Sequence, residues 1–278
     1  MDSVVQLFDS VVLEYFLKPF TLPEWLNQGS LARQIVSLEI LLFFGGLILY
    51  FCVSSTTYFL FFYFWKDFYH PDCQPQPFEG QIRQEIAVSL KSLPIMAQLM
   101  IPFFLAQVRG YALLYENFSD YGLAHFCLSA LLLLLWSDSL IYWIHREEHD
   151  IKFLYKHLHK LHHKFKVPTP YASFAFNPLD GFAQAFPYLV FPFVFPLHKW
   201  FYLATFIFLQ IWTVLIHDGV HLSPFWFVNG SAHHALHHSK FNYNYGQYLT
   251  FWDRLCRTHM DPQKHYDKDG KRWITKNQ

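Results

Sequence analysis

Ten of the 17 histidines in this 278-residue chain fall into four short groups. Two groups have the spacing HxxxH, and the other two have the spacing HxxHH. Their members are His145, His149, His159, His162, His163, His217, His221, His234, His237 and His238. On a helix, residues four apart lie above one another on one face, and positions 0, +3 and +4 span about 100° of arc. We therefore expect each group to direct its imidazoles at a single point.

Imidazole is a ligand that suits zinc, copper, iron and nickel. A single structural zinc ion takes four ligands, so ten imidazoles are too many for one ion. They suit a pair of ions with four or five ligands each. A redox pair beside apolar segments would suit the activation of O₂ against a C–H bond of a lipid. His157 and His233 lie beside the groups but off their spacing, and we expect neither to be a ligand.

Three aspartates are candidates for a supporting role around these imidazoles. A carboxylate that accepts an imidazole N–H fixes the tautomer and orientation of a metal ligand. Asp138 lies seven residues before His145, on the same face of a helix, and Asp180 and Asp218 also lie near the groups. For Asp138 the alternative is a plain hydrogen bond between two helices.

The composition predicts an integral membrane protein. Charged residues make up 15% of the chain and hydrophobic residues 53%, whereas an ordinary soluble domain has about 25% charged residues. Four apolar segments cover residues 37–64, 92–108, 121–144 and 182–216. A spanning helix needs about 20 apolar residues, so the first three segments can each cross once. The fourth is too long for one span, and we expect a hairpin that turns near His198.

The fold class that follows is an all-α integral membrane protein with four to five membrane segments, including the hairpin. With this topology, 17 of the 21 lysines and arginines lie on one side, together with all four histidine groups. The positive-inside rule assigns that side to the cytosol. We expect a cytosolic, helical, histidine-rich cap that holds a di-metal site. The chain is interpreted as one domain, 1–278, with a core at about 31–255 and a polar tail at 261–278.

Several longer motifs accompany the histidines. The stretches that carry a family resemblance are IHREEH at 144–149, KHLHKLHH at 156–163, PTPYASFAFNPLDG at 168–181, IHDG at 216–219, NGS at 229–231 and NYNYGQY at 242–248. With them, the chain resembles the sterol C5-desaturase (lathosterol oxidase) subfamily of the fatty acid hydroxylase and sterol desaturase superfamily. The bare histidine groups are shared across the superfamily, whereas the stretches at 168–181 and 242–248 are typical of the subfamily.

The resemblance implies an oxidoreductase with a non-haem di-iron centre and O₂ as co-substrate. Such an enzyme removes two hydrogens from C5 and C6 of a Δ7-sterol during sterol biosynthesis, in the endoplasmic reticulum membrane. The ligands of the family fall on the ten histidines named above. Cytochrome b5 and its reductase would supply electrons, and the chain has no glycine-rich nucleotide motif of its own.

Two other functions remain open from the sequence. A related di-iron lipid hydroxylase or C4-methyl sterol oxidase would use the same histidine groups. A histidine-rich membrane protein that binds or transports metal belongs to another class, but transporters place their ligands near the bilayer midplane. Nucleic acid is excluded as a partner, because the formal net charge is zero and no basic stripe is present. We expect the hairpin and the segment 121–144 to wall a sterol tunnel.

Overall fold

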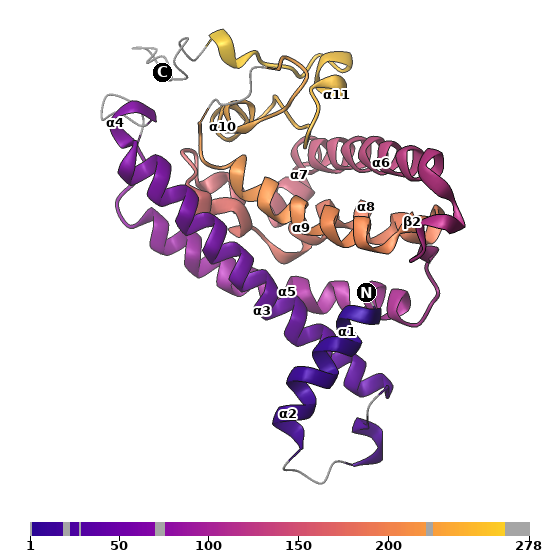
Figure 1. Cartoon of the computed structure of the whole chain (residues 1–278). Helices are drawn as coiled ribbons and strands as arrows, with labels where there is room; N and C mark the ends of the chain where they lie inside the picture. Colours follow the sequence, from indigo (N-terminus) through magenta and orange to yellow (C-terminus); the bar gives the residue numbers. More distant parts are fainter. Residues whose placement is uncertain (1, 19–22, 28, 70–75, 221–224, 265–278) are drawn as a thin grey trace.

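Helices dominate the computed structural model, which describes residues 2–18, 23–27, 29–69, 76–220 and 225–264 (Figure 1). Three helices are long and apolar enough to cross a membrane. They are α3 (Leu31–Tyr58, continued by the π-helix η3, Phe59–Phe64), α5 (Gln81–Val108) and α6 (Gly122–Asp150). The chain is therefore a helical membrane protein, as its composition predicts.

Helix α5 begins eleven residues before the apolar segment that was expected to form it, at Gln81 rather than at position 92. Its first turns are amphipathic, and Gln81, Glu85 and Ser89 are buried. These side chains make hydrogen bonds to the segment 167–171. Hydropathy alone misses such a helix start, because the polar face is covered by protein rather than by lipid.

The expected hairpin is present as two antiparallel helices, α8 (Pro178–Val194) and α9 (Lys199–Leu215), which are joined at residues 195–198. Asn177 caps α8, since its side chain accepts a hydrogen bond from the backbone N–H of Leu179. At the turn, strand β2 (Leu197–His198) pairs in parallel with strand β1 (Leu114–Tyr115). This two-stranded sheet is a small exception to the all-α expectation.

The long helices pack against one another. Helix α3 lies along α5 and α9, and α8 lies between α5 and α6 (Figure 1). Phe104, Tyr142, Leu189 and Tyr202 are among the large side chains that are fully buried in this packing. The ends of α6 and α9 and the start of α8 therefore meet at one end of the bundle, which we call the histidine end.

The N-terminal region forms short helices that the sequence analysis did not predict. They are α1 (Asp2–Phe8), the π-helix η1 (Asp9–Leu13), α2 (Glu14–Leu17) and the 3₁₀ turn η2 (Glu24–Leu26). Helix α1 packs on α3 and α5. Arg33, buried within α3, makes ion pairs of 2.7 Å with Asp9 and 2.8 Å with Glu14. These pairs satisfy a cation that would otherwise be buried alone.

Short helices complete the structure. They are α4 (Lys66–Tyr69), η4 (Phe118–Asp120), α7 (Lys152–Leu154), η5 (Tyr155–His159), η6 (His162–Lys164), η7 (Pro170–Phe174), α10 (Ser231–Lys240), α11 (Phe251–Leu255) and η8 (Pro262–Lys264). Helices α10 and α11 lie over α6 and the end of α9, at the top of Figure 1. This region covers the histidine end of the bundle.

Candidate metal centre

The elements that carry the histidine groups converge at the histidine end. His145 and His149 lie one turn apart in the last turns of α6. The second group spans the end of the π-helix η5 and the start of the 3₁₀ helix η6. His217 follows α9, and the last group lies on α10. Four segments that are distant in the sequence thus supply one site.

Nine of the ten predicted ligands form two compact clusters. In each cluster, one nitrogen from every histidine lies within 4.8 Å of all the others. The five-histidine cluster contains His145, His149, His159, His163 and His237. The four-histidine cluster contains His162, His217, His234 and His238. The tenth candidate, His221, lies outside the described residues.

We expect each HxxHH group to direct its imidazoles at a single point, and for these two groups that expectation is wrong. In the first group, His159 and His163 belong to the five-histidine cluster and His162 to the other. The second group is split in the opposite sense, since His237 alone joins the five-histidine cluster. Positions 0 and +4 lie close together around a helix, whereas +3 is rotated by about 100° from +4. That rotation is large enough to reach a second metal position.

Backbone carbonyls fix the ring orientation in the five-histidine cluster. Nδ1 of His145 donates to the carbonyl oxygen of Tyr245 at 3.0 Å, and Nδ1 of His237 donates to that of Tyr243 at 2.7 Å. A carbonyl can only accept, so both imidazoles carry their proton on Nδ1. Each Nε2 therefore presents a lone pair. The motif at 242–248 supplies both carbonyls, which gives this stretch a physical role in the site.

The four-histidine cluster is oriented in the same way. Nδ1 of His217 donates to the carbonyl oxygen of Thr213 at 2.6 Å. Nδ1 of His238 donates to that of Phe165 at 3.0 Å. Hydrogen bonds of this kind from the second ring nitrogen are a regular feature of metal-binding histidines. The Nε2 atoms of both rings are left as acceptors.

These Nε2 atoms face one another at the separation that a shared cation would require. Nε2 of His159 lies 3.1 Å from Nε2 of His145 and 3.0 Å from that of His163. In the other cluster, Nε2 of His234 lies 3.1 Å from Nε2 of both His217 and His238. Two nitrogens bound at about 2.0–2.1 Å to one metal ion, at right angles, lie about 3 Å apart. The donor set therefore fits a metal ion in each cluster.

Burial keeps the imidazoles in the neutral form that binds metal. Desolvation lowers the pKa of His217 to about 4. The same effect, together with repulsion between neighbouring imidazoles, holds the pKa well below its usual value for five others. These are His162, His163, His234, His237 and His238. Protons thus do not compete strongly with a metal ion near neutral pH.

Two carboxylates flank His159. Its Nδ1 donates to Oδ2 of Asp180 at 2.8 Å, and Oδ1 of Asp180 accepts from Gln184 at 2.6 Å. Asp180 thus occupies the supporting position that the sequence suggested. Glu148 was not singled out, although it is buried and its Oε2 lies 3.7 Å from the same Nδ1. Its position three residues after His145, on the same helix face, was the available signal.

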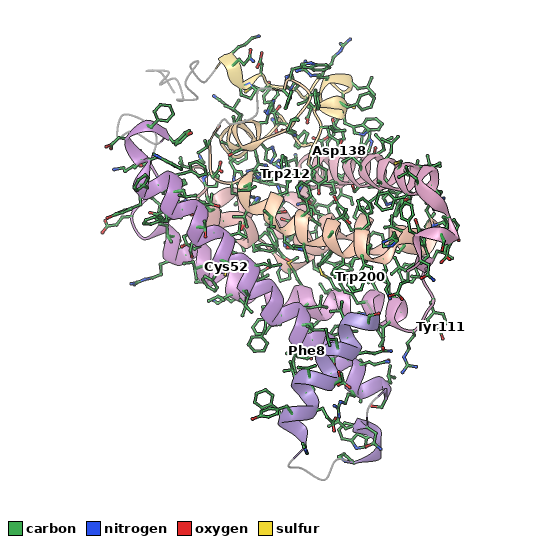
Figure 2. The ribbon with its side chains drawn as sticks, in the orientation of Figure 1. Phe8, Cys52, Tyr111, Asp138, Trp200 and Trp212 are labelled. Carbon is green, nitrogen blue, oxygen red and sulfur yellow. The ribbon has the colours of Figure 1, made fainter. Side chains whose placement is uncertain are left out.

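Asp138 contacts no imidazole among the described residues. It accepts the backbone N–H groups of Tyr248 at 2.9 Å and Leu249 at 3.1 Å. Asp138 lies seven positions before His145, about 10 Å away along the helix, and so it lies opposite the 245–249 loop instead. Figure 2 shows it on α6, with Trp212 on the neighbouring α9. Asp138 therefore anchors the 245–249 loop on α6.

Asp218 also makes other contacts than those expected. Its Oδ1 accepts the backbone N–H of Val220 at 2.8 Å and the hydroxyl of Ser231 at 2.5 Å. Burial raises its pKa to about 7, an effect that these hydrogen bonds oppose. Asp218 thus ties the end of α9 to the start of α10. It contacts no histidine within the described part of the chain.

A cavity among the membrane helices reaches the two clusters. Its wall includes His145, His162, His217 and His234, together with residues of α5, α6, α8, α9 and η7. The hairpin and α6 were expected walls, but α5 and η7 were not. A more apolar cavity of about 220 Å³ between α3, α5 and α9 shares part of this wall. The shared residues are Met96, Met100, Phe174 and Gln210.

Comparisons with known proteins agree with this geometry. The family model described as Fatty acid hydroxylase matches residues 130–258, which hold all four histidine groups. No solved structure matches the chain.

Curated relatives match almost the whole chain. It is 42% identical to "Lathosterol oxidase" of Rattus norvegicus over 267 residues, which are 94% of this chain and 86% of the relative. The protein of the same name from Homo sapiens is also 42% identical, with the same coverage. "Delta(7)-sterol 5(6)-desaturase erg31" of Schizosaccharomyces pombe is 46% identical, over 88% of this chain and 80% of the relative. The chain therefore belongs to the sterol C5-desaturase family, that of the lathosterol oxidases and Delta(7)-sterol 5(6)-desaturases.

Proposed function

We propose that this protein is an O₂-dependent oxidoreductase that introduces the C5=C6 double bond into Δ7-sterols during sterol biosynthesis. The observation that carries the proposal is the junction of two cavities. One has four imidazoles in its wall, and the other is apolar and lies between α3, α5 and α9. The names of the relatives specify the reaction.

We infer that the two clusters hold a pair of iron ions. When bound, the irons would activate O₂. Over one reaction, O₂ would accept two electrons from the sterol and two from an external donor, and with four protons it would become two water molecules. The nine clustered histidines are the proposed ligands, together with His221. Their donor nitrogens already converge at metal-binding separations. Asp180 and Glu148 place their carboxylates next to Nδ1 of His159, the ring nitrogen that faces away from the proposed metal ion.

Residues around the clusters orient the imidazole rings, exclude bulk water and provide an apolar wall. The carbonyls of the 242–248 motif and the end of α9 hold the rings so that each Nε2 faces inward. Burial of the histidines excludes bulk water. Met96, Met100 and Phe174 provide an apolar wall next to the imidazoles, which suits a substrate whose reacting atoms are carbons.

We propose that the protein is a multi-pass membrane protein of the endoplasmic reticulum, with a single domain over 1–278 and the histidine end in the cytosol. The hairpin α8–α9 would complete the membrane region as a fourth and fifth segment. The topology is testable with an impermeant maleimide in sealed microsomes. We expect labelling of Lys156→Cys, above the background of the parent protein. Tyr111→Cys, at the opposite end, should react only after permeabilisation.

Cytochrome b5, reduced by its reductase, is the proposed electron donor. Four lysines at four-residue intervals, Lys152, Lys156, Lys160 and Lys164, are exposed around the buried residues His159, His162 and His163. Such a stripe suits an acidic partner, and charge complementarity mainly raises the rate of association. We expect Lys156→Glu with Lys160→Glu to raise the KM for cytochrome b5, most strongly at low salt. Lys264→Glu, exposed elsewhere on the same end, is the matched control.

The test of the reaction is a sterol profile by gas chromatography and mass spectrometry. Cells that lack their own C5-desaturase would express the wild type, His162→Ala or His157→Ala. We expect Δ5,7-sterols with the wild type and with His157→Ala, because His157 is exposed and lies in neither cluster. His162→Ala should give none. Unchanged Δ7-sterols in cells that express the wild type well would refute the proposed reaction, and hydroxylated lipids would then identify the related activity.

A further inference from the structure

The cavity beside the histidines contains polar groups that the proposed metal centre does not use. Ser173 lines this cavity and is fully buried, and its hydroxyl has no hydrogen-bond partner among the described residues. A buried polar group without a partner costs free energy, because it has lost its hydrogen bonds to water. Such a group next to a substrate cavity indicates a partner that arrives with the ligand.

Gln210 offers a second polar group. It lies in α9, whose sequence around it is apolar, and it forms part of the wall of both cavities. Its amide makes no hydrogen bond within the described part of the chain. A polar residue in a membrane-embedded helix suggests a functional role. Helix α9 packs against η7, the short helix that contains Ser173.

Two other polar side chains of the cavity are already engaged. The amide of Gln184 donates to Asp180 at 2.6 Å. The hydroxyl of Thr213 donates to the carbonyl of Leu209 at 2.8 Å. Ser173 and Gln210 can therefore accept and donate towards a ligand without breaking an existing hydrogen bond.

We propose that Ser173 and Gln210 form a hydroxyl subsite, which binds the C3 hydroxyl of the sterol at the histidine end of the cavity. This inference rests on the proposed function. In a sterol, three bonds separate the hydroxyl oxygen from C5, so a substrate with C5 and C6 beside the imidazoles has its hydroxyl in the same cavity. A hydroxyl both donates and accepts, and a serine hydroxyl and a glutamine amide match it in both roles.

The subsite also fixes the direction of the substrate. The hydrocarbon tail lies at the far end of the ring system from the hydroxyl. It would extend past Phe174 into the apolar cavity, where Leu38, Leu49 and Phe206 line the wall. The hydroxyl thus lies next to the histidine end and the tail points towards the middle of the membrane helices.

The test compares a Δ7-sterol with its 3-deoxy analogue, which differs only in the missing hydroxyl. For the wild type we expect kcat/KM to fall by about tenfold to a hundredfold with the analogue, because the buried polar groups remain unpaired. Ser173→Ala and Gln210→Leu should lose activity with the natural sterol but little with the analogue. Equilibrium binding of the two radiolabelled sterols to chelator-treated protein should show the same ratios, independently of turnover.

Thr213→Val is the matched control, because Thr213 lines the same cavity and its hydroxyl already donates to the carbonyl of Leu209. We expect this variant to keep the wild-type preference for the hydroxylated sterol. If Thr213→Val abolishes that preference while Ser173→Ala keeps it, the assignment of the subsite is wrong. Equal kcat/KM for both sterols in the wild type would overturn the subsite and leave the proposed function standing. If the wild type neither binds nor converts a Δ7-sterol, both proposals fail.

Discussion

The imidazole of His159 donates from Nδ1 to the carboxylate of Asp180 at 2.8 Å, and both side chains are completely buried. The hydrogen bond fixes the tautomer, so that Nε2 faces the Nε2 atoms of His145 and His163. Two segments 21 residues apart in the chain are thereby joined at the metal-binding face. Asp180 belongs to α8, and so the hairpin itself takes part in holding the five-histidine cluster.

Asp180→Ala should weaken metal binding by about tenfold to a hundredfold, because His159 loses the acceptor that orients it. The measurement is the iron content of purified protein during titration with a chelator. Asp138→Asn serves as the control, since Asp138 bonds to backbone N–H groups and to no imidazole. Equal iron retention by the two variants would contradict a supporting role for Asp180.

His162→Ala and His163→Ala should each reduce the iron content to about one ion per chain, but they should spare different ions. The two residues are neighbours in the sequence, yet each belongs to a different cluster. His162→Ala leaves the five-histidine cluster intact, and His163→Ala leaves the four-histidine cluster intact. Mössbauer spectra of the remaining iron should therefore differ. Identical spectra would mean that both residues bind the same ion.

Gly181→Ala should destabilise the protein by about 1–3 kcal/mol, as is typical of overpacking a tight site. A β-carbon at this position would overlap the ring of Phe176 and lie 2.8 Å from Sδ of Met96. Both residues line the cavity beside the histidines, so the activity should fall as well. Gly45→Ala makes the same change where nothing lies within 4 Å of the new carbon. Thermal unfolding in detergent should separate the two variants, and equal melting temperatures would count against this packing.

Glu85→Leu should also destabilise the protein by about 1–3 kcal/mol, because it leaves buried donors without an acceptor. Glu85 accepts from the hydroxyl of Thr169 at 2.5 Å and from Gln81 at 2.6 Å. It thereby holds the segment that leads into η7 against α5. Glu79→Leu, an exposed position just before the helix, should change the stability by less than about 0.5 kcal/mol. Similar unfolding midpoints for both variants would show that Glu85 contributes no such anchor.

The sequence alone determined the features that depend on local spacing. The lengths of the apolar segments predicted the membrane helices, and the length of the fourth segment predicted a turn near His198. The helical periods of the histidine groups predicted metal chemistry, because i and i+4 neighbours share a face whatever surrounds the helix. These inferences needed no knowledge of which segments meet.

The tertiary structure decided the features that depend on contacts between distant segments. It divided His162 from His163, and it placed Asp180 rather than Asp138 beside an imidazole. It also brought Glu148 to the site and buried Ser173 in the cavity wall. Spacing along one helix says which side chains share a face, but only the packing of helices fixes what that face meets. For this protein, the pattern of residues indicated the chemistry, and the packing determined how the ligands are shared and where a substrate fits.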